Sequence, residues 1–237
     1  MNAHAPPQPP LQHRFTRDML PRAFQVIGQW LFLGALLFVC AGTLTWGWAW
    51  AYLVLVMALT LVNLFVLPPE LIVERGKPGK NVKRWDRVIT GISIIPGLAL
   101  YVVAGLNERF AWPPLLSPTW HVLGLALIVV GMALFSWAMS ANAYFATTVR
   151  LQTERGQTVA EGGPYRYVRH PGYVGYILSV VASALALGSV WALIPAAMTA
   201  ALFVTRTSLE DRALRAELPG YMDYARRVRF RLLTGVW

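Results

Sequence analysis

Charged residues are scarce in this chain. Asp, Glu, Lys and Arg make up 14% of the 237 residues, whereas hydrophobic residues make up 56%. A soluble globular domain carries about a quarter charged residues, so these proportions exclude a water-soluble globule, and they exclude intrinsic disorder as well. The single cysteine, Cys40, excludes an internal disulfide framework and a cysteine-rich metal site. The four histidines lack the spacing of metal ligands, so the sequence predicts no metal site.

The hydrophobic residues are concentrated in long runs. A helix that crosses a bilayer needs about 20 apolar residues. The last two runs hold about 16 residues each, or roughly 24 Å of helix, and they share a turn at Gly188-Ser189. The pattern predicts an all-α, polytopic integral membrane protein with about six transmembrane helices, of which the last two form a short hairpin. The predicted spans are 24–43, 46–67, 88–106, 120–140, 173–188 and 190–205.

The positive charge has a clear distribution along the chain. The net charge is +10, and with six spans every Lys and Arg except Arg109 falls on one side. The positive-inside rule makes that side cytoplasmic, so both termini are expected in the cytoplasm of a cell (inner) membrane protein. Anionic lipid headgroups, and not nucleic acid, are the expected partners of these basic residues. Residues 68–87, which carry many of them, are interpreted as a solvated connector.

The predicted spans divide the chain into three parts. Residues 1–22 form a Pro-rich tail that is expected to be disordered. Residues 23–140 hold four transmembrane helices, and residues 141–237 hold the hairpin and a cytoplasmic carboxy-terminal segment with the candidate site.

Polar donors gather before the predicted fifth helix. Pro171 suits the first turn of a helix, and the residue before a proline is driven to extended geometry. Tyr165, Arg169 and His170 therefore lie just outside a helix N-terminus, where free N–H groups favour an anion. The carboxylate of an amino-acid-like cofactor would fit there. The alternative is that the arginines bind lipid phosphates and the tyrosines anchor the membrane interface.

An acidic cluster follows the predicted sixth helix. Arg206 and Glu210 are four residues apart, so they share one helix face, and Asp211 comes directly after them. The hairpin should return this cluster to the turn at His170, where acidic and basic groups together could bind a zwitterionic ligand. The alternative is a surface ion pair at a helix end.

These two clusters resemble a known family. The matching residues are Gly-Pro-Tyr-Arg-Tyr-Val-Arg-His-Pro-Gly-Tyr-Val-Gly at 163–175, then a helical hairpin, then Arg206 with Glu210-Asp211. They resemble the isoprenylcysteine carboxyl methyltransferases, within the membrane methyltransferases that include the phospholipid methyltransferases. The resemblance covers about residues 142–237 and makes 141–237 a methyltransferase core. It implies S-adenosylmethionine as cofactor, bound at the cytoplasmic rim of a helical, non-Rossmann fold.

The resemblance also implies roles for individual residues. It makes Arg206 and His170 catalytic, and it assigns Arg206 and Tyr173 to the methyl acceptor. Two departures from the family pattern are Asp211, where a second Glu is usual, and the absence of the proline that usually follows the Arg-Val stretch, with Thr234 nearby instead. Gln157 stands where a His is common, which weakens the transfer at that position. The implied cofactor-binding residues are Arg150, Gln157, Thr158, Val159, Ala160, Tyr165, Arg169, His170, Pro171, Gly172, Tyr173, Glu210 and Asp211.

The function expected from these residues is methyl transfer to a lipophilic or prenylated acceptor in the membrane. A carboxylate acceptor is favoured over an amine, because Arg206 could hold a carboxylate and a carboxylate needs no general base. Two alternatives are a membrane NADPH-dependent reductase of the sterol-reductase type and a non-catalytic membrane protein. The sequence assigns neither the acceptor nor an oligomeric state.

Overall fold

The computed structural model describes residues 20–76 and 81–237, and within these ranges it contains helices and no strand. The predicted tail therefore lies outside the described residues, except that residues 20–22 already belong to the first helix. Two one-turn 3-10 helices, Thr153–Arg155 and Gly163–Arg166, interrupt the segment before α6. The α-helices are α1 (Leu20–Ala41), α2 (Gly47–Val66), α3 (Pro69–Gly76), α4 (Arg84–Phe110), α5 (Pro118–Ser140), α6 (Pro171–Ala186), α7 (Leu193–Glu217) and α8 (Tyr221–Arg227).

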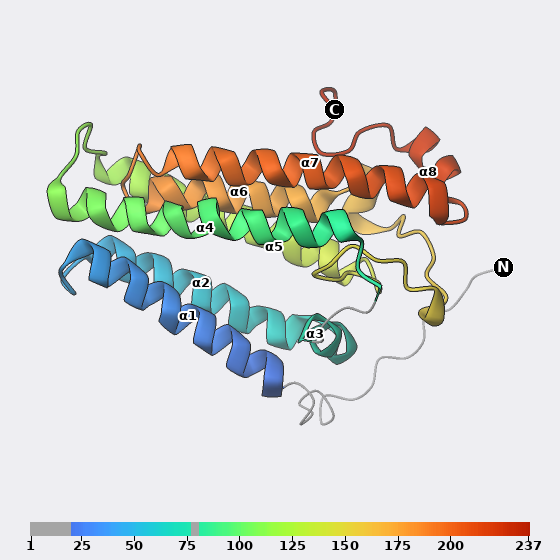
Figure 1. The fold of residues 1–237 in the computed structure, drawn as a ribbon, viewed down its shortest axis with the longest axis horizontal. Coiled ribbons are helices and arrows are strands. Elements are labelled where there is room, and N and C mark those ends of the chain that lie inside the picture. Colours follow the sequence, from blue (N-terminus) through green and yellow to red (C-terminus); the bar gives the residue numbers. More distant parts are fainter. Residues whose placement is uncertain (1–19, 77–80) are drawn as a thin grey trace.

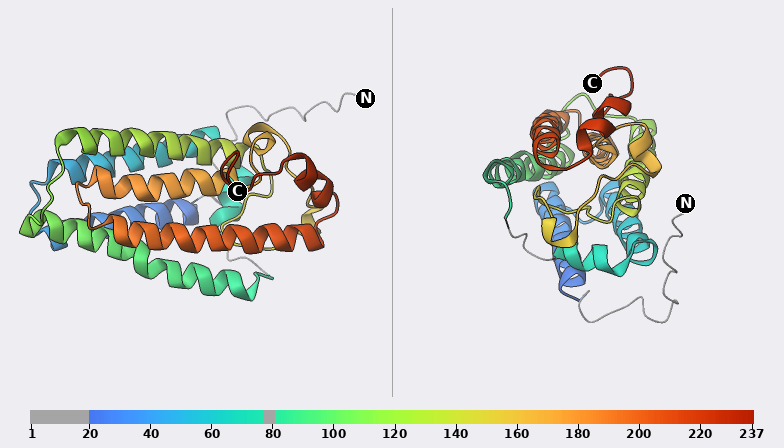
Figure 2. Two further views of the ribbon diagram at one scale, coloured as in Figure 1. Left: turned by 90° about the horizontal axis from the view of Figure 1, so that it is seen from above. Right: turned by 90° about the vertical axis from the view of Figure 1, so that its right-hand side faces the viewer.

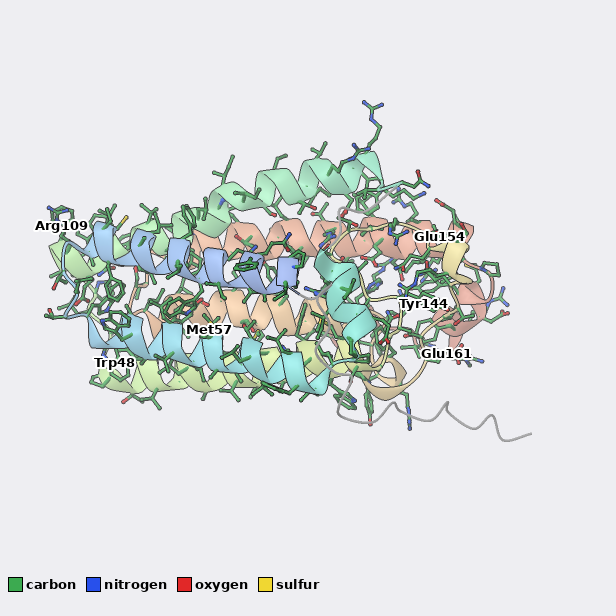
Figure 3. The ribbon with its side chains drawn as sticks, turned by 90° about the horizontal axis from the view of Figure 1, so that it is seen from below. Trp48, Met57, Arg109, Tyr144, Glu154 and Glu161 are labelled. Carbon is green, nitrogen blue, oxygen red and sulfur yellow. The ribbon has the colours of Figure 1, made fainter. Side chains whose placement is uncertain are left out.

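The long helices run along the molecule and alternate in direction (Figure 1). Helices α3 and α8 and the segment 141–170 consequently lie at one end, as the end view in Figure 2 also shows. Figure 3 places Arg109 at the opposite end from Tyr144 and Glu154. The fold therefore brings the segment that carries the predicted basic cluster to the same end as the last turns of α7.

Helices α1, α2, α4 and α5 are each long and apolar enough to cross a membrane. They confirm the first four predicted spans, with ends that differ by a few residues. Helix α6 is a shorter apolar helix of 16 residues. Helix α7 has 25 residues, from Leu193 to Glu217, so it begins within the predicted sixth span and continues past the end of that span at 205. Arg206 and Glu210 therefore both lie within the helix, in the second half of α7.

The turn between α6 and α7 forms where the sequence predicts it. Gly188 has a positive φ of 77°, which glycine adopts without a steric penalty. The hydroxyl of Ser189 accepts a hydrogen bond from the N–H of Ala192 at 3.1 Å and donates one to Asn107 Oδ1 at 2.9 Å. The turn is therefore fixed both to the start of α7 and to the end of α4.

Helices α5 and α6 pack with their backbones in close approach. A Cβ atom added at Gly131 would collide with the Ser179 hydroxyl and the backbone of Gly175, and one added at Gly175 would collide with the backbone of α5. Small residues permit this kind of packing in membranes, where helix association depends on close van der Waals contact. This close packing fixes the position of α6 against α5, and with it the position of the turn that precedes α6.

The arrangement leads to a topology prediction. Reporters fused after Trp237 and inserted at Glu154 should give cytoplasmic signals, and a reporter inserted at Arg109 should give a signal from the other side. The reason is the excess of Lys and Arg at the end that holds Glu154. A cytoplasmic signal at Arg109 would contradict the six-span topology.

Candidate functional site

A cavity of about 480 Å³ lies at the end of the molecule that holds the segment 141–170. This volume is in the range of pockets that bind cofactors and small ligands, about 300–1,000 Å³. Two of the predicted site residues, Pro171 and Asp211, are not in its walls. The predicted residues that do line the cavity are Arg150, Gln157, Thr158, Val159, Ala160, Tyr165, Arg169, His170, Gly172, Tyr173, Arg206 and Glu210.

The turn before α6 is held by the carboxy-terminal segment. The backbone N–H groups of Arg169 and His170 donate to the carbonyl oxygens of Phe230 and Arg231, each at 2.9 Å. Helix α6 begins at Pro171, as predicted, with His170 as its N-cap residue. His170 is thereby fixed at the cavity wall, with its Nε2 3.4 Å from the hydroxyl of Tyr221.

Arg169 and Asp211 form a buried ion pair behind the turn. Nε and Nη2 of Arg169 donate to the two carboxylate oxygens of Asp211 at 2.7 and 3.1 Å. Nη1 donates to the carbonyl oxygens of Val228 and Arg229, both at 2.7 Å. Every nitrogen of this guanidinium is therefore bound to protein, which gives Arg169 a positioning role, and its contact with a cofactor stays a prediction.

Asp211 is fully buried and binds several donors at once. Besides Arg169, its oxygens accept from Arg215 and Arg231 at 3.0 Å each and from the Tyr221 hydroxyl at 3.0 Å. Burial raises the pKa of Asp211, but hydrogen bonds from His170, Arg169 and Arg231 outweigh burial and hold the pKa well below its usual range. Asp211 therefore has a structural role outside the cavity walls, and its contact with a cofactor stays a prediction.

Arg206, Tyr173 and Glu210 are in contact in the wall of the cavity. The Tyr173 hydroxyl donates to Glu210 Oε2 at 2.5 Å, and Glu210 is half-buried. The Arg206 guanidinium lies 5.4 Å from the centre of the Tyr173 ring. The shared face that the four-residue spacing predicts is thus confirmed, with Tyr173 between the two charges.

The alternative of a surface ion pair between Arg206 and Glu210 is wrong, because Arg206 is buried and pairs elsewhere. Its Nε donates to Asp86 Oδ1 at 2.7 Å, and its Nη2 donates to the Thr147 carbonyl at 2.9 Å. Asp86 Oδ2 accepts from the N–H of Val149 at 2.8 Å. One carboxylate therefore compensates Arg206 and also anchors the segment that forms the cavity wall.

Asp86 is the residue that the sequence interpretation missed. It is fully buried in the first turn of α4, so the interpretation of 68–87 as a solvated connector is wrong at this position. The same holds for α3, where Leu71 and Ile72 are buried. The available signal in the sequence was a single acid between basic residues and an apolar run. The signal is weak because the burial of Asp86 depends on its ion pair with Arg206, which comes 120 residues later in the chain.

Other walls of the cavity are held by side-chain amides. Asn142 Nδ2 donates to the Tyr165 hydroxyl at 3.2 Å, and Asn142 Oδ1 accepts from the N–H of Tyr144 at 2.9 Å. Gln157 Oε1 accepts from the N–H of Gln152 at 2.7 Å. In the described part of the chain no group of three His, Cys, Asp or Glu residues is placed to hold a metal ion. The cavity walls therefore carry both acidic and basic side chains, and hydrogen bonds hold the wall segments in place.

Comparison with known proteins confirms the resemblance seen in the sequence. Residues 119–217, which include α5, α6 and α7, match the model of the phospholipid methyltransferase family. Over 139 residues the chain is 30% identical to protein-S-isoprenylcysteine O-methyltransferase of Mus musculus and 29% identical to that of Homo sapiens. These alignments cover 54% of this chain and 49% of each relative, so the chain spans about half the length of the curated relatives it matches.

Proposed function

We propose that this protein is an integral membrane methyltransferase that moves the methyl group of S-adenosylmethionine to the carboxylate of a lipophilic acceptor. The observation that carries the proposal is the cavity next to the His170 turn, which both Glu210 and His170 line. Both residues belong to the segment that matches the phospholipid methyltransferase family. The relatives are named as methyltransferases of isoprenylcysteine, which is a prenylated carboxylate. A prenylated or isoprenoid acid is therefore the acceptor class to test.

The residues of the cavity fit S-adenosylmethionine. The ligand carries an amino-acid end with opposite charges, and Glu210 is the acid in the described walls that could pair with its ammonium group. His170 and the first turn of α6 could bind its carboxylate. Apolar side chains, such as Val159, Leu214 and Leu218, offer a surface for the adenine ring.

The same walls fit a nicotinamide dinucleotide phosphate poorly. That ligand needs several cations for its phosphates. Arg169 and Arg206 are neutralised by Asp211 and Asp86, and Arg150 pairs with Glu154. Three of the four arginines that line the cavity are thus committed to protein carboxylates, and the fourth, Arg75, would be one cation where several are needed, which argues against the reductase alternative.

Methyl transfer to a carboxylate requires mainly that the protein bind and orient the two reactants. When bound, S-adenosylmethionine supplies an electrophilic methyl group. A carboxylate acceptor reacts through an oxygen that is already a nucleophile, so His170 has no proton to remove. The contributions of the chain are then to orient the acceptor, to exclude water and to hold Glu210 through the Tyr173 hydroxyl.

The cofactor part of the proposal predicts ligand-dependent stability. S-adenosylhomocysteine should raise the melting temperature of the purified protein through mass action, and NADPH should not. Glu210→Gln and His170→Ala should each weaken S-adenosylhomocysteine binding by about 1.5–3 kcal/mol, the range for a lost hydrogen bond to a charged group. Thermal unfolding in detergent measures the melting temperatures, and titration calorimetry measures the affinities.

Glu217→Gln is the matched control for Glu210→Gln. Glu217 lies on the same helix but binds Lys83 outside the cavity, so its replacement should leave the affinity for S-adenosylhomocysteine unchanged. Stabilisation by NADPH alone would support the reductase, and stabilisation by neither ligand would support a non-catalytic protein. Transfer of labelled methyl groups into lipid and peptide extracts, followed by mass analysis, then identifies the acceptor.

A further inference from the structure

A second cavity, of about 310 Å³, lies among α1, α2, α3 and α5. Figure 3 shows Met57, one of its lining residues, between α1 and α2 and away from both ends of the molecule. Gln29, Arg75 and Phe135 line both this cavity and the candidate cofactor cavity, so the two spaces meet at these side chains. Its apolar walls include Val26, Leu33, Val56, Met57, Leu64, Ile72 and Met132.

Arg75 stands at the junction with an unused hydrogen-bond donor. Its guanidinium lies 5.5 Å from the ring centres of both Phe135 and Phe145, and these rings meet edge to face at 5.3 Å. Its Nη1 is buried and has no hydrogen-bond partner. The other such atom in the described chain belongs to the neutral indole of Trp46. A buried donor without a partner is costly, so a charged one on a residue that lines two cavities indicates a ligand.

The charged residues that line the second cavity also indicate a ligand, and an anionic one. Arg22 and Arg75 both line it, and no acid does so among the described residues. Burial and, to a smaller extent, the positive charge of Arg22 together lower the pKa of Arg75 to about 10, so Arg75 still carries its charge at neutral pH. A cationic entrance beside an apolar chamber suits an amphiphile with an anionic head and a hydrocarbon tail.

We propose that Arg75 binds the carboxylate of the methyl acceptor while the acceptor's apolar tail lies in the cavity among α1, α2 and α5. This inference rests on the proposed function and names the part of the fold that selects the acceptor. It moves the predicted carboxylate contact away from Arg206, whose charge Asp86 already balances at 2.7 Å. Arg75 lies outside the segment 119–217 that matches the family model.

The test compares a carboxylate with its uncharged analogue. The probes are N-acetyl-S-farnesylcysteine and the carboxamide of the same compound, titrated into the full-length protein in detergent with S-adenosylhomocysteine present. The wild-type protein should prefer the acid by about tenfold or more, because a charge-assisted hydrogen bond is lost with the amide. Arg75→Gln should remove this preference and keep the affinity for the amide, and Arg75→Lys should restore part of it.

Three further measurements make the outcome decisive. Arg87→Gln, at an exposed arginine near the same end, should leave the preference unchanged. Affinity for S-adenosylhomocysteine should stay the same in Arg75→Gln, which reports both a folded protein and a separate cofactor site. Phosphatidylglycerol micelles should not displace the farnesyl acid at equal concentration.

Retention of the acid preference in Arg75→Gln, or displacement by phosphatidylglycerol, would overturn the assignment of Arg75 and leave the methyltransferase proposal intact. Failure of the wild-type protein to bind S-adenosylhomocysteine would instead overturn the proposed function itself.

Discussion

Replacement of Asp211 by Asn is expected to lower the free energy of unfolding by about 3–5 kcal/mol, as when one partner of a buried ion pair is removed. Asp211 is fully buried and faces the guanidinium groups of Arg169, Arg215 and Arg231. The asparagine has nearly the same shape but no charge, so it leaves these cations without their shared counterion. Chemical unfolding in mixed micelles, followed by far-UV circular dichroism, measures the loss.

The same substitution should also abolish binding of S-adenosylhomocysteine, because Arg169 and the His170 turn depend on this carboxylate. Asp223→Asn is the matched control. Asp223 pairs with Arg226 at 3.3 Å with both side chains more than 70% exposed, the values being 73% and 75%. Such surface pairs contribute about 0–1 kcal/mol, so the control should behave like the wild type. Equal stability of the two variants would mean that the buried cluster is not what holds the turn.

A second large effect is expected at the ion pair between Asp86 and Arg206. Asp86→Asn and Arg206→Gln should each cost about 3–5 kcal/mol in stability, since each leaves one buried charge alone. The double variant should lose less than the sum of the two, with a coupling energy of about 0.5–3 kcal/mol. A thermodynamic cycle built from the four proteins measures this coupling.

The cycle also separates two roles for Arg206. If Arg206 bound the acceptor directly, Arg206→Gln would raise the acceptor KM and Asp86→Asn would not, although both variants lose stability. If Arg206 instead positions Tyr173 through the contact between guanidinium and ring, both variants should change kcat and stability together. A large KM effect confined to Arg206→Gln would contradict the structural role.

Local chemistry made parts of the site predictable. The start of α6 at Pro171, the turn at Gly188 and the shared face of Arg206 and Glu210 follow from backbone geometry over a few residues. The spans of α1, α2, α4 and α5 follow from hydrophobic length alone. Each of these features depends on near neighbours in the sequence, which is why the pattern of residues was sufficient.

The remainder depends on pairing between distant segments. Asp211 follows Glu210 directly in the sequence, but adjacent residues on a helix point about 100° apart, and the Asp211 carboxylate binds Arg169 in the turn before α6. The role of Asp86 depends on its ion pair with Arg206. The role of Arg75 depends on the contact of its guanidinium with the rings of Phe135 and Phe145. No local pattern identifies such partners, because they meet only when the helices pack against one another in the fold.

The ion pair between Asp86 and Arg206 restricts how this fold can be recombined. The match to the methyltransferase family begins at residue 119, so Arg206 lies inside the matched segment and Asp86 lies outside it. A chimera that joins residues 119–237 to the first helices of a relative would bring Arg206 without its carboxylate, unless that relative supplies an acid at the corresponding helix start. Such a hybrid would contain a buried, unpaired cation at the membrane boundary. We therefore expect a chimera of two relatives to fold only when its two parts together supply both the acid and the arginine of this pair.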